Sequence, residues 1–324
     1  MQPCQPRVSV VIPTYGRSED LGSAIRSVVG QTYDNIELII VDDGSPTPVE
    51  EELSLPSVSS SLSAVQSIRH DENRGANVAR NTGIQASTGE YVAFLDDDDA
   101  WVETKVERQV SAFEDSPREI GVVVTGIREE SASGTTVKTP AEDGDVVTAL
   151  LAGKNFGQFS SLMVRADIIN AAGLPDEQFP IWQDREWYFR LAQHAEFYSI
   201  PEPLTVRTVG HSDQISHNFE AKRDIAYPLF LEKHRSLAAN YGWRYERLFL
   251  ASLRFSLAKT AVRCQRYREA RKYFLLAFLS YPTYQQCLIM VLATLGGGAS
   301  YGLARVINRK IRKLHETFLR TVSR

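Results

Sequence analysis

Four consecutive aspartates, Asp96 to Asp99, directly follow an apolar run in the segment AFLDDDD (93–99). Like charges held side by side repel one another, so a folded chain keeps such a cluster only where a positive group offsets it. A divalent cation that is held by carboxylates and shared with a substrate diphosphate would do so. A solvated acidic turn is the simpler alternative. A helix–loop–helix calcium site fits poorly, because its sixth position, Trp101, is not glycine.

Other polar segments also follow apolar runs. PTY (13–15), DDGS (42–45) and HDENRG (70–75) come after the runs at 8–12, 36–41 and 65–69, and the four aspartates come after 91–95. These short, β-branched runs predict buried strands, as do 120–124 and 159–164.

Helical spacing of apolar residues lies between these runs. It predicts a helix behind Ser18 and further helices at 75–87, 103–114 and 184–194. Strands that alternate with helices predict an α/β protein with an open, mostly parallel sheet and helices on both faces. Ligands of such sheets bind at the carboxyl ends of the strands, where the polar segments gather.

Two long stretches resemble the nucleotide-binding half of the family 2 inverting glycosyltransferases, which have the GT-A fold. They read VSVVIPTYGRSEDLGSAIRSVVGQTYDNIELIIVDDGSP and NRGANVARNTGIQASTGEYVAFLDDDDAW. The resemblance runs from residue 7 to about residue 110 and resumes more weakly over 159–215. Each motif alone is weak, but all of them occur in the family's order and at its spacing.

The resemblance implies a binding site for a nucleotide-sugar donor. It places Pro13, Thr14 and Tyr15 along the base and ribose and has Asp43 hydrogen-bond the base. Arg74 and Arg80 are the candidates to contact phosphate or ribose oxygens, which suits a planar guanidinium. Taken alone, DDGS could be a simple turn, and either arginine could be an ordinary surface ion-pair partner.

The family's Asp-x-Asp motif maps onto the aspartate cluster. The resemblance makes Asp98 the first candidate for a metal ligand, adds Asp96, and places Asp97 near the ribose or the metal. Asp99 adds a fourth carboxylate, which leaves the assignment within the cluster open. The implied cofactor is Mg²⁺ or Mn²⁺.

The segment IWQDREWYFRLA (181–192) resembles the part of the family in which a Glu-Asp pair precedes a helix. Gln183 replaces the glutamate, and Asp184 is then the candidate general base. The alternative is that Asp184 only caps the helix. In VRTVGHSDQIS (206–216), His211 is a candidate to approach the metal or the diphosphate, and a solvent-exposed loop histidine is the alternative.

The second part of the chain differs in charge. Residues 1–225 carry 18 Lys and Arg against 36 Asp and Glu, whereas residues 226–324 carry 18 against 4. We therefore expect a GT-A domain over 1–218 and a helical, basic region over 219–324. The stretch 273–304 has no charged residue, but Pro282 and a glycine triplet interrupt it. It predicts either a membrane-spanning helix or a buried helical hairpin.

The basic amphipathic segment 305–320 suits an anionic membrane surface. The overall net charge of −4 does not suggest nucleic acid as a partner. Three scattered cysteines indicate neither a disulfide framework nor a zinc site and fit a reducing compartment. The five-residue apolar run Val8–Ile12 is too short for a signal peptide.

Together these features predict a metal-dependent inverting glycosyltransferase at the cytoplasmic face of the membrane. Its acceptor would be a polyprenyl-phosphate-linked glycan or another membrane-bound molecule. A non-catalytic nucleotide- or glycan-binding module and a soluble glycosyltransferase with a different acceptor are the alternatives. A nucleotidyltransferase could share the sheet and the carboxylates, but it would lack a base placed like Asp184.

Overall fold

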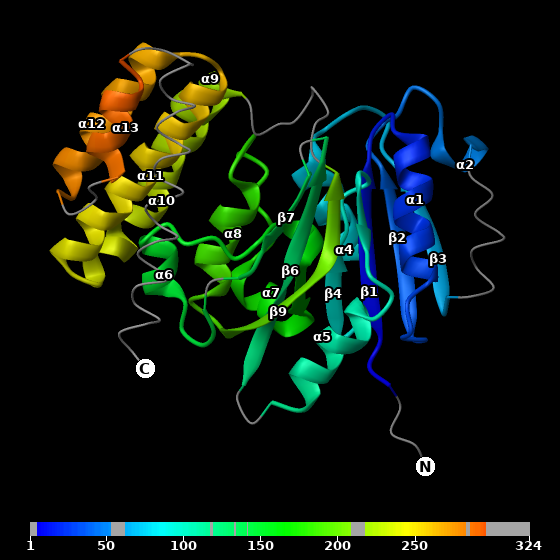
Figure 1. The fold of residues 1–324 in the computed structure, drawn as a ribbon. Coiled ribbons are helices and arrows are strands. Elements are labelled where there is room, and N and C mark those ends of the chain that lie inside the picture. Colours follow the sequence, from blue (N-terminus) through cyan, green and yellow to red (C-terminus); the bar gives the residue numbers. More distant parts are fainter. Residues whose placement is uncertain are drawn as a thin grey trace. The chain divides into compact units, whose positions relative to one another are not determined.

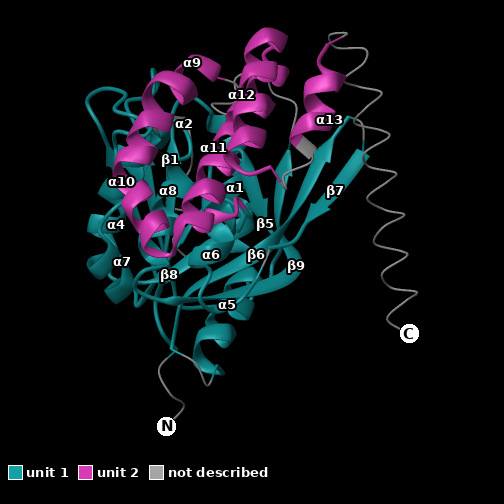
Figure 2. Cartoon of the chain, turned by 90° about the vertical axis from the view of Figure 1, so that its left-hand side faces the viewer, with its two compact units in different colours: residues 1–150, 154–212 teal, residues 151–153, 213–324 magenta. Residues whose placement is uncertain are grey.

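The chain forms two compact units, residues 1–150 with 154–212 and residues 151–153 with 213–324 (Figure 2). The computed structural model describes residues 5–52, 62–116, 119–132, 134–140, 142–208, 218–282 and 286–295.

Within the described residues, the first unit is built on a nine-stranded sheet in the order β3-β2-β1-β4-β8-β6-β9-β5, with β7 paired to β6 (Figure 1). Strands β1, β2, β3 and β4 pair in parallel, as do β6 and β9. Strand β8 runs antiparallel to β4 and β6, and the pairs β5–β9 and β6–β7 are also antiparallel. The strands are β1 Val8–Thr14, β2 Ile36–Asp42, β3 Ala64–Arg69, β4 Tyr91–Phe94, β5 Asp99–Trp101, β6 Ile120–Ser131, β7 Gly134–Lys138, β8 Leu162–Arg165 and β9 Glu196–Thr208.

Helices cover both faces of the parallel part, which explains why β1 and β2 are buried along their whole length. On one face, Ile12 and Ile40 belong to the core cluster that also contains Leu21 of α1. On the other face, Ile39 contacts Ala79 of α4. The helices of this unit are α1 Ser18–Val29, α2 Val49–Glu52, α4 Ala76–Ala86, α5 Lys105–Glu114, α6 Val147–Leu151, α7 Ala166–Ala172 and α8 Gln183–Leu191, and a short 3₁₀ turn spans Phe159–Ser161.

Helix α4 lies very close to β1. A Cβ atom at Gly83 would stand 2.3 Å from a Cγ of Val11, which is closer than any two carbons pack. Only glycine allows the helix this approach.

The described part of the second unit is helical. It contains α9 Phe219–Ala221, a π-helical turn Lys222–Ala226, α10 Tyr227–Asn240, α11 Trp243–Arg263, α12 Tyr267–Ser280 and α13 Gln286–Ala293. The predicted α/β class, an open sheet with helices on both faces followed by a helical region, is confirmed, and the sheet carries antiparallel strands beside its parallel part. Among the residues that the structure describes, no helix combines the length and the apolar character needed to cross a bilayer.

Candidate active site

The carboxyl ends of β1, β2 and β4 bring three of the predicted polar segments to one edge of the sheet. Thr14 at the end of β1 is paired with Asp42 at the end of β2, and Val11 is paired with Phe94 at the end of β4. The aspartate cluster therefore begins beside the PTY and DDGS segments, as expected for parallel strands.

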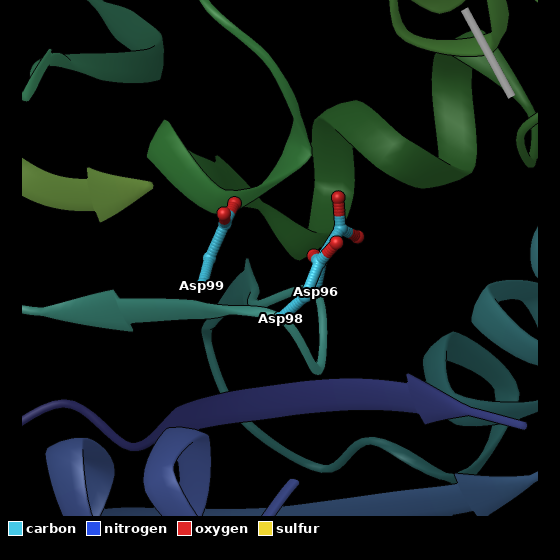
Figure 3. A group of neighbouring side chains, drawn as sticks. All are labelled: Asp96, Asp98 and Asp99. Carbon is cyan, nitrogen blue, oxygen red and sulfur yellow. The ribbon is translucent and has the colours of Figure 1, made fainter. Parts of the chain in front are cut away.

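Three of the four aspartates lie close together, and the fourth, Asp97, makes a separate contact. Asp96, Asp98 and Asp99 each offer a carboxylate oxygen, and these oxygens lie within 4.8 Å of one another. Figure 3 shows the three side chains projecting to the same side of the segment that carries them. Asp97 has a different partner, because its Oδ2 accepts a hydrogen bond from Thr14 Oγ1 at 2.8 Å. Asp99 was not among the predicted ligands, and Asp97 is not part of this group.

Each carboxylate of the cluster has an arginine nearby. The closest pair joins Arg80 Nη2 to Asp96 Oδ1 at 2.6 Å. Arg17 Nη1 lies 3.3 Å from Asp97 Oδ1 and 3.2 Å from Asp98 Oδ2, and Arg207 Nε lies 4.0 Å from Asp99 Oδ1. The sequence analysis missed Arg17 and Arg207. Arg17 could have been noticed beside the PTYG segment, whereas Arg207 reaches Asp99 only through the β5–β9 pairing.

The arginines do not fully offset the negative charge. Burial raises the pKa of Asp97 to about 6, although Thr14 and Arg17 oppose the shift. Burial, reinforced by the charge of Asp96, also raises the pKa of Asp98 and raises that of Asp99 well above its usual range. The nearby arginines therefore do not compensate fully for the burial and mutual repulsion of these carboxylates.

The three clustered aspartates have the properties of a divalent cation site. Among the residues that the structure describes, none donates a hydrogen bond to the buried Asp99 Oδ1, while Gln158 Nε2 donates to Asp99 Oδ2 at 2.8 Å. A buried carboxylate oxygen without a donor is costly unless a cation completes its coordination. Oxygen-only donor sets suit Mg²⁺ and Mn²⁺. Asp96, Asp98 and Asp99 could therefore hold such an ion.

Arg80 connects three segments that are far apart in the sequence. Its buried guanidinium donates to Asp96, to Asn77 Oδ1 at 3.1 Å and to Gln183 Oε1 at 3.3 Å. It also stacks over the ring of Phe159 at 4.0 Å. These contacts join α4, the end of β4 and the start of α8. In the structure Arg80 is thus held by protein groups, while the other predicted arginine, Arg74, is exposed.

Asp43 is buried at the end of β2 and organises the loop that follows β3. Its Oδ1 lies 2.7 Å from His70 Nδ1 and accepts from the Arg74 backbone N–H at 3.0 Å, and its Oδ2 accepts from the Gly75 N–H at 2.7 Å. Two carboxylate oxygens have about four acceptor sites, so Asp43 can still accept a further donor. His70 was not predicted, although it opens the HDENRG segment.

Asp184 lies in the first turn of α8. The N-cap of this helix is Trp182, which has a left-handed backbone (φ 66°) and no capping side-chain hydrogen bond. Asp184 Oδ1 accepts from the N–H of the next residue, Arg185, at 2.6 Å. Burial raises the pKa of Asp184, Asp96 adds to the shift, and Arg80 opposes it. Asp184 therefore shares the electrostatic environment of the cluster, and a raised pKa makes it a stronger base.

The remaining predicted residues lie at the same edge or outside the described part of the chain. Pro13 and Thr14 are buried, and Tyr15 is 46% exposed. His211 lies outside the described residues.

Replacing Arg17 should strengthen cation binding. Arg17 is 42% exposed and competes with a cation for Asp98. Because half-exposed ion pairs are weak, we expect Arg17→Gln to lower the Mn²⁺ dissociation constant by about two- to fivefold, measured by calorimetry without donor. Arg26→Gln, at an exposed position of α1, the helix that begins directly after Arg17, is the control and should leave Mn²⁺ binding unchanged. Weaker Mn²⁺ binding by Arg17→Gln would show that Arg17 supports the cluster instead.

The raised pKa of Asp97 should make stability depend on pH. The pKa is about 6 in the folded chain against 3.8 for an ordinary aspartate, so the folded state binds this proton more tightly. The stabilisation is complete below the lower value and is lost as the pH rises through the higher one. In EDTA, we expect the free energy of unfolding to fall by about 1–3 kcal/mol more in the wild type than in Asp97→Asn across this range. Parallel denaturation curves for the two proteins would contradict the assignment.

The open α/β sheet with helices on both faces, followed by a helical region, is a GT-A type fold. The fold is similar to that of Staphylococcus aureus TarS 1–349 in complex with UDP-GlcNAc, with a TM-score of 0.54 over 86% of this chain and 92% of that one, at 15% identity.

Residues 9–160 match the sequence model of Glycosyl transferase family 2. An uncharacterized glycosyltransferase of Haemophilus influenzae is 30% identical over 208 residues, which cover 62% of this chain and 68% of the relative. The chain therefore belongs to glycosyltransferase family 2, and the resemblance found in the sequence is confirmed.

Other relatives match over shorter shares of their length. The chain spans 38% of an uncharacterized glycosyltransferase of Rickettsia felis, at 29% identity over 70% of this chain. A UDP-Glc:alpha-D-GlcNAc-diphosphoundecaprenol beta-1,3-glucosyltransferase of Escherichia coli is 35% identical over 104 residues, which are 32% of this chain and 40% of that enzyme.

Proposed function

We propose that this chain is a metal-dependent inverting glycosyltransferase that transfers a sugar from a nucleoside-diphospho-sugar to a membrane-bound acceptor. The observation that carries this proposal is the joint placement of the cluster and Asp184, with Arg80 bonded to Asp96 on one side and to Gln183 on the other. The carboxylates of Asp96, Asp98 and Asp99 are thereby available to bind a cation, and the separate carboxylate of Asp184 is available to accept the acceptor proton.

The donor would lie across the carboxyl ends of β1 and β2. Pro13, Thr14 and Tyr15 would line the base and ribose, and the free acceptor site of Asp43 would receive a base N–H. Asp97 would face the ribose, and Arg74, being exposed, would be free to turn toward the diphosphate. A uridine nucleotide is the first donor to test, because the TarS complex contains UDP-GlcNAc and the Escherichia coli relative is named for UDP-Glc.

A Mg²⁺ or Mn²⁺ ion held by Asp96, Asp98 and Asp99 would supply the charge that stabilises a departing diphosphate. Asp184 would accept the proton of the acceptor hydroxyl as that oxygen attacks the anomeric carbon. Arg80 would keep the base and the cluster at a fixed separation, because it is bonded to both segments. One direct displacement inverts the anomeric configuration. His211 stays a predicted additional ligand.

The acceptor would be a polyprenyl-phosphate-linked glycan at the cytoplasmic face of the membrane. Two observations support this class: the Escherichia coli relative is named for an undecaprenyl diphosphate-linked substrate, and the region after residue 225 is strongly basic. We keep the division into a GT-A domain over 1–218 and a membrane-associated region over 219–324 as part of this proposal.

The test is a transfer assay with a panel of UDP-sugars, a polyprenyl diphosphate-linked acceptor, and either Mn²⁺ or EDTA. We expect metal-dependent transfer with at least one donor and a product whose anomeric configuration, determined by NMR, is opposite to that of the donor. Nucleotide binding without transfer or donor hydrolysis would favour a binding module. Retention of configuration would remove Asp184 from the role of base.

A further inference from the structure

Helices α12 and α13 carry an exposed apolar surface, which we call the leucine face. Its side chains are 43–64% exposed, although each is a large hydrophobic residue. The two helices pack against each other, and Arg271 Nη1 donates to the Thr294 carbonyl oxygen at 2.7 Å between them. The leucine face consists of Leu275 and Leu279 on α12, and of Leu288, Ile289, Leu292 and Leu295 on and just after α13.

The spacing puts these residues on one side of each helix. Leu275 and Leu279 are four residues apart, and Leu288, Leu292 and Leu295 are separated by four and three, which is the repeat of a single helical face. The opposite sides are already packed, as Phe274 of α12 and Cys287 of α13 are fully buried. Single exposed apolar residues are ordinary, but six large ones on two adjacent helices mark an interaction surface.

The charges beside the leucine face indicate what it contacts. On α12 the exposed side continues from Leu275 to Lys272 and Arg268, again at spacings of three and four. The sequence has no Asp or Glu from 270 to 315, and the nearest acidic residue, Glu269, is paired with Arg266. An apolar face bordered by cations, with no anion within it, matches the headgroup and acyl boundary of an anionic bilayer.

A second copy of the chain fits this surface less well. A two-fold symmetric contact would place the same Arg268 and Lys272 side chains on both partners, and the face offers no carboxylate to pair with them.

We propose that the leucine face inserts shallowly into the surface of an anionic lipid bilayer, with Arg268 and Lys272 at the headgroups. This insertion would dock the chain on the membrane that holds the proposed acceptor. Only this link to the acceptor rests on the proposed function. It needs no spanning helix, because residues inserted from one helical side reach only the interface.

The experiment measures binding of the full chain to vesicles by flotation. We expect binding to vesicles of phosphatidylcholine and phosphatidylglycerol, and much weaker binding to phosphatidylcholine alone. Leu279→Ser with Leu292→Ser should lower the partition coefficient by about ten- to a hundredfold, because two apolar side chains no longer leave water. Val137→Ser with Ile225→Ser, at positions of similar exposure elsewhere, is the matched control and should bind like the wild type.

The charged and apolar contributions can be separated with salt. Arg268→Gln with Lys272→Gln should weaken binding to anionic vesicles by roughly fivefold per residue and should reduce its salt dependence. The wild type should stay partly bound at high salt, since salt screens charges but not apolar burial.

Three outcomes would overturn the inference: no vesicle binding by the full chain, equal binding by the leucine and control variants, or a wild-type dimer in sedimentation that Leu279→Ser with Leu292→Ser dissociates. Hydrolysis of UDP-sugar without acceptor, measured on the same variants, keeps the two proposals separate. Intact hydrolysis without vesicle binding contradicts only the docking surface. Vesicle binding without hydrolysis or transfer contradicts only the proposed activity.

Discussion

Asp98→Asn should abolish detectable sugar transfer while leaving the chain folded. Asp98 contributes one of the three carboxylates that could hold a cation, so its loss should weaken Mn²⁺ binding at least about a hundredfold and reduce turnover by roughly a thousandfold or more. The substitution removes a charge from a crowded group whose pKa is already raised, so the metal-free protein should not lose stability.

Thermal unfolding separates these effects. In EDTA the melting temperature of Asp98→Asn should equal or exceed that of the wild type, and the increase that Mn²⁺ causes in the wild type should shrink in the variant. Asp71→Asn removes an exposed carboxylate after β3 and is the control for net charge. Turnover that persists in Asp98→Asn, or in wild type with chelator, would show that the reaction does not need this site.

Asp184→Asn should lower turnover by roughly 10²–10⁴, the usual contribution of a general base, with donor affinity unchanged. The side chains are nearly isosteric, and the N-cap of α8 is Trp182, so the helix should form as before. Turnover number and donor dissociation constant are measured separately, by initial rates and by calorimetry with UDP.

The pH profile gives a second, independent readout for Asp184. Burial raises the pKa of this carboxyl, and only its ionised form can accept a proton, so wild-type turnover should rise with pH through that raised pKa. The rise should be absent from the residual activity of Asp184→Asn. Loss of donor affinity in proportion to turnover, or an unchanged pH limb, would indicate a positioning role in place of proton transfer.

The sequence predicted the local part of this fold well. The apolar runs at 8–12 and 36–41 lie within β1 and β2, and the predicted helix at 75–87 is α4, Ala76–Ala86. These elements can be predicted from the spacing of their own apolar side chains. Parallel pairing then places PTY and DDGS at one edge of the sheet. The position of the aspartate cluster follows from the same rule.

The long-range contacts of the site could not be predicted in this way. Asp99 faces Arg207 because β5 pairs with β9, across more than a hundred residues of sequence. Arg80 bonds to Gln183 over a similar separation. No local period encodes such a pairing, so these arginines were assigned only as general anion-binding candidates or not at all. Arg17 was missed because its contacts depend on the conformation of the loop after β1.

The close approach of α4 to β1 has a consequence for which substitutions the site tolerates. Gly83 has no functional group and lies one turn beyond Arg80 on the same helix, yet a single methyl group there would collide with Val11 and push the helix outward. Such a shift would carry the Arg80 guanidinium away from Asp96 and Gln183 together. Substitutions at the contact between α4 and β1 should therefore impair activity. Gly83 takes no part in the reaction, but it sets the position of Arg80 relative to Asp96 and Gln183.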